Sequence, residues 1–162
     1  MKKNLLILLM LVICTGMMAS GQARKKKQTA SRPAVTAKAL VGHTYAKHDL
    51  KVADPELAEA YDNGSFKLVI DVSVYFVTEN VLQFTMMADL ESRVYSKEEM
   101  RQTKAAMGFK PMNEVDEQNY YIKNGVIYDS DTNHQIAVIN NGGKSITLKD
   151  DLFNGNLLPK IE

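Results

Sequence analysis

The loop at residues 129–133 carries the side chains whose spacing comes nearest to a metal-binding motif. Asp129-Ser130-Asp131-Thr132-Asn133 places carboxylate and amide groups at alternate positions, as at the start of a calcium-binding loop. His134 stands where such a loop needs a glycine for its sharp turn, and Asn140 stands where it needs a bidentate glutamate. Asp and Asn also stabilise turns by hydrogen bonding to their own backbone. The run therefore predicts a hairpin loop rather than an ion site.

The histidines and the glycine-rich loop give no arrangement that could perform catalysis. His43 and His48 are an odd number of residues apart, which puts them on opposite faces of a strand, and no cysteine lies near them. The run Asn141–Lys144 lies between two predicted strands, without the helix N-terminus that a phosphate-binding loop requires. The chain has no nucleophile elbow and no Ser-His-Asp arrangement. We therefore expect a protein that is not an enzyme and that carries no metal or cofactor.

Residues 1–23 have the organisation of a signal peptide. Two lysines precede the short apolar run Leu5–Ile13, and small residues follow it. Cleavage after Ala23 places a glycine and an alanine at the −3 and −1 positions, and cleavage after Ala19 is the alternative. The apolar run is shorter than the roughly 20 residues of a membrane-spanning helix. We therefore expect an exported protein, periplasmic or extracellular, with no stable membrane insertion after the signal is removed.

The single cysteine, Cys14, lies inside this signal. A lipoprotein signal needs a small residue just before its cysteine, but that residue is Ile13, so we expect a soluble product rather than a lipid-anchored one. The mature chain then has no disulfide and must be held together by a hydrophobic core. The formal net charge of +1 gives no indication of a nucleic-acid partner.

Residues 24–39 form a polar stretch between the signal and the rest of the chain. The basic run Arg24–Lys27 opens it, and mostly Ala, Thr, Ser, Pro and further basic residues follow. Such a composition buries too little apolar surface to fold by itself. The basic run would suit a tether to an anionic surface, but the composition favours a solvated tail. We expect a disordered linker at 24–39, followed by one domain at 40–162.

The C-terminal part of the chain predicts an antiparallel meander. Within Tyr120–Lys149, short apolar strands alternate with polar turns. Asn124-Gly125 is a strong signal for a two-residue type I′ turn, because both of its central residues need a positive φ. Such a turn pairs Ile122 with Ile127 and so fixes the register of the hairpin.

Two longer strands precede the meander. Apolar residues occupy alternate positions from Phe66 to Val77 and from Val81 to Leu90, the period of a strand with one buried face. Long strands joined by tight turns suit a barrel, whose closure removes unpaired strand edges. Residues 112–121 return to a strand pattern. Residues 152–161 form either a last short edge strand or a segment that wraps the base.

The sequence also predicts one or two short helices. Residues 54–61 begin with Asp followed by Pro, a good N-cap and first position for a helix. Ser96 and Glu99 form a capping box for a second helix, which runs to Met107 before Gly108. We expect this second helix to pack on the barrel wall or across one end.

The order of these strands and turns resembles the small secreted lipocalin-like domains of the calycin type. The resemblance rests on Gly42-His43-Thr44-Tyr45, the alternating strand pair, Tyr121–Ile127 and Lys144–Leu148, and it covers residues 40–155. Tyr45 stands where lipocalins usually carry a tryptophan. The resemblance implies a mainly β fold, an antiparallel up-and-down β-barrel of about seven to eight strands.

The leading functional hypothesis is a non-enzymatic barrel that binds a small apolar ligand in its interior. The inward-facing, ligand-binding set is predicted as Phe66, Leu68, Ile70, Val72, Val74, Phe76, Leu82, Phe84, Met86, Ile122, Ile127, Ile136, Val138, Ile146 and Leu148. The alternative is a protein-interaction or structural module with a filled barrel, and a hydrolase is the third hypothesis. An outward apolar and aromatic patch would serve the alternative: Val69, Tyr75, Val77, Tyr121 and Tyr128.

Overall fold

A computed structural model describes residues 35–51 and 64–161 of the chain. The predicted signal peptide, most of the predicted linker and the predicted helix at 54–61 lie outside the described residues. The described chain begins inside the predicted linker, with a 3₁₀ turn, η2 (Ala37–Ala39), and with Val35 packed against the core. The end of the predicted linker is therefore part of the folded domain.

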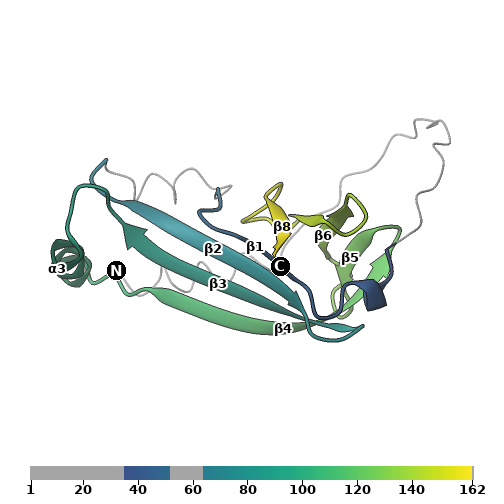
Figure 1. The fold of residues 1–162 in the computed structure, drawn as a ribbon. Helices are drawn as coiled ribbons and strands as arrows, with labels where there is room; N and C mark the ends of the chain where they lie inside the picture. The colour runs from purple at the N-terminus through teal and green to yellow at the C-terminus, as the bar shows by residue number, and fades with distance from the viewer. Residues whose placement is uncertain (1–34, 52–63, 162) are drawn as a thin grey trace, which may run out of the picture. The chain divides into compact units, whose positions relative to one another are not determined.

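Eight antiparallel strands form a closed barrel in which every strand pairs with its neighbours in sequence and the last pairs with the first (Figure 1). Among the described residues one α-helix, α3 (Lys97–Met107), stands between the third and fourth strands. The strands are β1 (Thr44–Lys47), β2 (Lys67–Phe76), β3 (Val81–Glu91), β4 (Met112–Lys123), β5 (Val126–Asp129), β6 (Gln135–Asn140), β7 (Ser145–Leu148) and β8 (Leu157–Ile161). The predicted mainly β, up-and-down barrel is confirmed.

Three of the strands are much longer than the others. β2, β3 and β4 have 10, 11 and 12 residues, whereas β1, β5 and β7 have 4 each. The pairing of β1 with β2 is limited to residues 72–75 of β2. The pairing of β5 with β4 is limited to residues 120–123 of β4. The long strands therefore run past the short ones, and Figure 1 shows them extending towards α3.

The C-terminal strand closes the barrel. β8 pairs with β7 through Ile146 and Leu158, and with β1 through Thr44 and Ile161. It therefore has partners on both sides, and neither expectation for residues 152–161, an edge strand or a wrapping segment, describes it. The pairing of β8 with β1 therefore closes the sheet into a barrel.

The β4–β5 hairpin has the predicted turn and register. Asn124 and Gly125 have φ values of 55° and 77°, as a type I′ turn requires. Ile122 pairs with Ile127, so both side chains face the interior. This part of the prediction is confirmed.

Helix α3 begins and ends where its sequence signals predict. The Ser96 backbone N–H donates to Glu99 Oε2 at 2.7 Å, and the Glu99 N–H donates to Ser96 Oγ at 3.3 Å. Hydrogen bonding of the Glu99 carboxyl to the Ser96 hydroxyl, and then to the Ser96 backbone N–H, lowers the pKa of this carboxyl. Gly108, with φ 66°, ends the helix, and Lys104 Nζ lies 2.6 Å from Asp89 Oδ1 on β3. Neither α3 nor any other described helix is long and apolar enough to cross a membrane.

Candidate functional site

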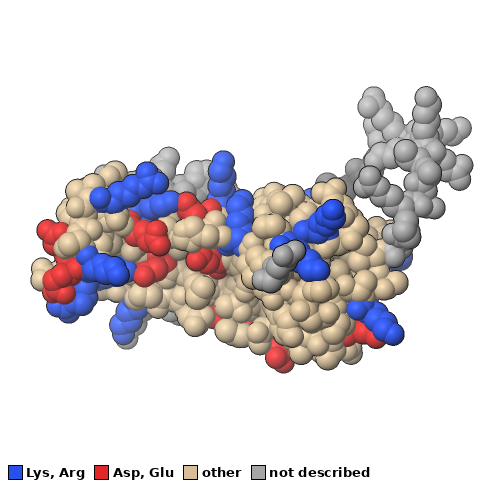
Figure 2. Space-filling model, viewed as in Figure 1, with Lys and Arg blue, Asp and Glu red and all other residues tan. Residues whose placement is uncertain are grey.

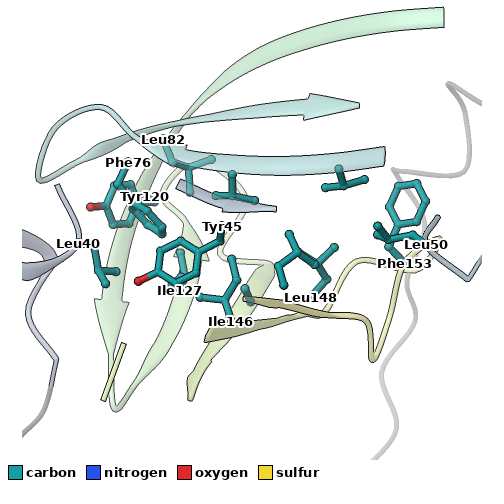
Figure 3. Close-up of a cluster of buried hydrophobic side chains, with 14 of the residues drawn as sticks. Leu40, Tyr45, Leu50, Phe76, Leu82, Tyr120, Ile127, Ile146, Leu148 and Phe153 are labelled. Carbon is teal, nitrogen blue, oxygen red and sulfur yellow. The ribbon is translucent and has the colours of Figure 1, made fainter. Parts of the chain in front are cut away.

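The barrel interior, which the sequence predicts as the binding site, is occupied by one contiguous cluster of buried side chains (Figure 3). Every strand contributes at least one of them. The predicted interior residues that are buried in the cluster are Ile70, Val72, Val74, Phe76, Leu82, Ile127, Ile146 and Leu148. Those that are half-buried and pack against it are Leu68, Phe84, Met86, Ile122 and Ile136.

Three aromatic rings form the centre of the cluster. Phe76 contacts Tyr45 edge-to-face, with ring centroids 5.6 Å apart, and contacts Tyr120 in the same way at 5.3 Å. The three residues are no more than 2% exposed. Such pairs add about 0.5–1.5 kcal/mol beyond the burial of their area. The three rings therefore pack against one another inside the barrel.

The two buried tyrosines have partners for their hydroxyl groups. Tyr45 Oη donates to the carbonyl oxygen of Gly143 at 2.6 Å, and Tyr120 Oη donates to that of Thr78 at 3.1 Å. Burial raises the pKa of Tyr45. Burial, with a smaller contribution from Glu79, raises the pKa of Tyr120 to about 12. Both hydroxyls are therefore neutral structural groups at ordinary pH.

Apolar side chains from outside the strands lie at the two ends of the cluster (Figure 3). At one end Leu40 packs beneath Gly143, where an added Cβ would lie 3.7 Å from both Leu40 Cδ2 and Val35 Cγ1. At the other end Leu50 and Phe153 are 4% and 2% exposed. The apolar packing thus continues along the length of the interior.

A buried amide holds the base of the barrel together. Asn156 Nδ2 donates to the carbonyl oxygens of Lys51 at 2.8 Å and Phe153 at 3.1 Å. Asn156 Oδ1 accepts the Lys51 N–H at 3.3 Å. This network fixes the chain beside Leu50 against the loop that leads into β8.

The interior placement predicted for Val138 is wrong. The β5–β6 register shifts after the Ile127–Ala137 pair, so that Ile136 is the extra residue of a β-bulge. Ala137 is therefore fully buried inside, whereas Val138 is half-buried and outside the cluster. Phe66, which precedes β2, is also half-buried and outside the cluster.

Several core residues are absent from the predicted interior set. They are Leu40, Tyr45, Leu50, Ala88, Tyr120, Ala137, Phe153 and Leu158. Alternation could have found Ala88, two positions after Met86, and Tyr120, two positions before Ile122. Leu50 and Phe153 lie in loops, where no periodic pattern exists to reveal them.

The histidines and the Asp-rich loop have structural partners. His48 Nδ1 lies 2.7 Å from Asp71 Oδ1, and this hydrogen bond raises the pKa of His48. Asp129 Oδ1 accepts the N–H groups of Asp131 at 2.7 Å and Thr132 at 3.0 Å, which confirms the predicted hairpin loop. Within residues 35–51 and 64–161, no group of three or more His, Cys, Asp or Glu could hold a metal ion.

A small recess lies on the outside of the barrel next to η2. It has a volume of about 340 Å³, and Lys160 Nζ lies 3.3 Å from His43 Nε2 at its wall. Its lining residues are Val35, Thr36, Ala39, Leu40, His43, Gly142, Gly143 and Lys160. Leu40, which lines this recess, is also part of the buried core.

The predicted outward patch does not form a uniform surface. Val69 is only 4% exposed, whereas Tyr75 and Tyr121 are 37% and 36% exposed. Tyr121 stacks on Tyr128 with ring centroids 5.2 Å apart, and its hydroxyl lies 3.0 Å from Asn133 Oδ1. The exposed aromatic residues of this set are therefore divided between Tyr75 on β2 and the Tyr121–Tyr128 pair of the β4–β5 hairpin.

The first part of β4 presents an open sheet edge. Residues 112–119 pair with residues 81–88 of β3, and among the described residues no strand pairs with their other side. We call this segment the β4 open edge. Its side chains account for the opening: between Met112 and Tyr120 the inward positions hold the polar residues Glu114, Asp116 and Gln118, which contribute little to an apolar core.

The β4 open edge is also acidic. Glu114 and Asp116 lie directly opposite Met86 and Phe84, on the inward face, and Glu117 lies on the outward face. All three carboxylates are exposed. Gln118 Nε2 donates to Asp116 Oδ2 at 3.1 Å. The edge thus combines exposed backbone with clustered negative charge.

Comparison of the chain with protein-family models, with curated proteins and with solved structures gives no match.

Proposed function

We propose that this chain is an exported, non-enzymatic protein-interaction module, in which a filled barrel serves as a rigid scaffold and binding occurs on its outside. The observation that carries the proposal is the packed interior, where buried side chains from all eight strands meet around three aromatic rings. A barrel that carries an apolar ligand needs an interior cavity. Export is proposed from the signal-like residues 1–23.

Two surface features support an external binding role. The β4 open edge offers backbone hydrogen-bonding groups of the kind that other chains use for recognition. The stacked Tyr121 and Tyr128 add partly exposed aromatic surface on the adjoining hairpin. Both lie on β4 and its neighbour, so one partner could contact them together.

We also propose that the domain is lipocalin-like in the broad sense of barrel architecture. The closed antiparallel order of eight strands and the buried Tyr45 on the first strand support this kinship. We do not propose a ligand-carrying function for the barrel, since Tyr45 and its neighbours pack in the interior.

A binding experiment with apolar probes tests whether the barrel is filled. The purified protein is titrated with a fluorescent naphthalene probe and with a long-chain fatty acid, and its organic extract is analysed by mass spectrometry. We expect no saturable binding and no co-purified lipid. Phe76→Ala titrated with benzene is the positive control, because loss of the ring opens a cavity in the fully buried centre that a small aromatic molecule can enter. Stoichiometric binding to the unaltered protein would contradict the proposal.

A site-specific cross-linking experiment tests the external binding role. A photoreactive amino acid replaces Val115 on the β4 open edge or, as a control, Val41 near η2; the two side chains are 57% and 36% exposed. In cells that export the protein, we expect a discrete protein adduct from position 115 and none from position 41. Equal adducts from both positions, or none from either, would argue against a specific outer surface on β4.

A further inference from the structure

We propose that the β4 open edge binds an extended basic peptide by β-strand addition. The proposal rests on the interaction role proposed above and names the chemistry of the partner. Among the strands that the structure describes, only β3 pairs with residues 112–119 of β4, so an incoming strand can pair along the other side.

Hydrogen bonds at the end of this segment show which backbone groups point away from β3. The Tyr120 N–H donates to the Asn80 carbonyl oxygen on the β3 side, whereas the Asn119 carbonyl oxygen accepts the Ser130 N–H from the β5 side. Backbone groups alternate in direction along an antiparallel strand. Odd-numbered residues therefore direct their N–H and C=O groups away from β3. Along the open edge these residues are Asn113, Val115 and Glu117.

The side chains beside these backbone groups select a basic partner. Glu114 and Asp116 project from one face at alternate positions, and Glu117 projects from the other. In an added strand, residues two apart face the same side, so Lys or Arg at positions i and i+2 would lie next to Glu114 and Asp116. Met86 and Phe84, opposite the two carboxylates on β3, offer half-buried apolar surface to the aliphatic stems.

The same charges disfavour a second copy of this chain as the occupant. Antiparallel pairing of two β4 open edges centred on Val115 would place Glu114 of each copy opposite Asp116 of the other. Like charges directly opposite one another destabilise strand pairing. Charged edges prevent self-association in many sheets. The charges on the β4 open edge therefore disfavour pairing with a second copy of the chain and favour pairing with a strand of opposite charge.

The test uses a synthetic ten-residue peptide with Lys alternating with Thr or Val, titrated into the purified protein. Backbone amide NMR shifts should move at Asn113, Val115 and Glu117, and binding should weaken as salt is raised. The same peptide with Glu in place of Lys should not bind. The double variant E114Q/D116N should bind the basic peptide about tenfold more weakly, since two cross-strand ion pairs are lost. Glu79→Gln, which removes an exposed carboxylate away from the edge, should bind normally.

A proline substitution separates strand addition from simple charge attraction. Val115→Pro removes an outward N–H without removing a hydrogen bond to β3, so the sheet should persist while peptide binding is lost. Val115→Thr keeps the N–H and should bind as the unaltered protein does. Peptide binding that survives Val115→Pro, or amide shifts in the unaltered protein that avoid residues 113–117, would overturn strand addition. The shift measurement needs no variant, so it decides even if Val115→Pro misfolds.

Three further outcomes distinguish failure of this inference from failure of the proposed function. A dimer in solution that Val115→Pro abolishes would overturn the basic peptide in favour of a second copy. If the protein binds no apolar probe and gives adducts at position 115 but does not bind the basic peptide, only the proposed chemistry of the partner is overturned. A protein that binds an apolar probe in its interior would overturn the proposed function itself, whatever the peptide does.

Discussion

The two parts of β4 belong to one continuous strand but have different surroundings. Tyr120 and Ile122, in the second part, project into the core, and β5 pairs with this part of the strand. Glu114 and Asp116 project to the same side in the first part, and there β3 is the strand's only described neighbour. The barrel closes where the inward positions are apolar and stays open where they are acidic. Side-chain chemistry therefore decides how far along β4 the closure extends.

The surface follows the same division. Figure 2 shows Lys, Arg, Asp and Glu side chains crowded at the end that carries α3, whereas the end with the short strands is largely uncharged in this view. At the α3 end, Lys104 pairs with Asp89 and Arg101 pairs with Glu98. We expect stability to depend on the closed part and recognition on the open part.

The largest expected difference between the two parts is in the effect of truncating a side chain. Phe76→Ala removes the ring that contacts both Tyr45 and Tyr120, and should lower the free energy of unfolding by about 3–5 kcal/mol. Val115→Ala, on the β4 open edge, should change it by less than about 0.5 kcal/mol. Urea denaturation of both variants measures the difference. Similar losses from the two would remove the distinction between packed and open parts.

The next effect concerns the turn that joins the closed part of β4 to β5. Gly125 has φ 77°, and an added Cβ there meets no atom within 4 Å, so strain in Gly125→Val is purely conformational. We expect a loss of about 1–3 kcal/mol and a lower melting temperature. Gly125→Asn, which tolerates positive φ, is the control and should lose less. An unchanged melting temperature in Gly125→Val would mean that this turn does not constrain the closed part.

A smaller effect is expected in the helix that precedes the β4 open edge. Ser96→Ala removes the N-cap of α3 and should cost about 1 kcal/mol, whereas Ser96→Thr keeps a capping hydroxyl and should cost less. Hydrogen exchange by mass spectrometry should show faster exchange in α3 with little change in β5–β7. Faster exchange throughout the barrel would show that α3 and the closed part unfold as one unit.

The smallest effect at neutral pH is expected for Tyr120→Phe, but it changes with pH. The pKa of Tyr120 is about 12 in the folded chain, above the value of about 10 for an unfolded tyrosine. Between these values the folded state binds more protons, so the stability from this group is complete below pH 10 and is lost as pH rises through 12. Tyr120→Phe should therefore lose less stability than the unaltered protein between about pH 10 and 12. Parallel losses would mean that the Tyr120 hydroxyl is not buried.

Local sequence signals predicted most of the barrel. The alternation in β2 and β3, the Asn124-Gly125 turn and the capping box of α3 depend on neighbours in sequence, and each is confirmed. The interior placement that was wrong depends on pairing between two strands and not on the residues next to it in the sequence. The bulge at Ile136 turned Val138 out of the core.

The candidate site was also hidden from the sequence because it depends on distant pairing. The exposed Glu114 and Asp116 were visible as residues, but their place on an open edge depends on where β5 stops pairing with β4. Likewise, the packed interior depends on Leu50 and Phe153, which come from loops far apart in the chain. Only the three-dimensional arrangement joins these residues.

Residue-resolved amide hydrogen exchange along β4 measures directly whether the first part of the strand has a free edge. Alternation is expected in the open part: Asn113, Val115 and Glu117 should exchange fast, while the even-numbered amides facing β3 should be protected. Protection is expected at Tyr120, whose N–H donates to the Asn80 carbonyl oxygen, and at Tyr121 and Lys123, whose N–H groups face β5. Uniform protection from residue 113 to residue 123 would contradict the account, because the edge would then be covered and unavailable to a partner.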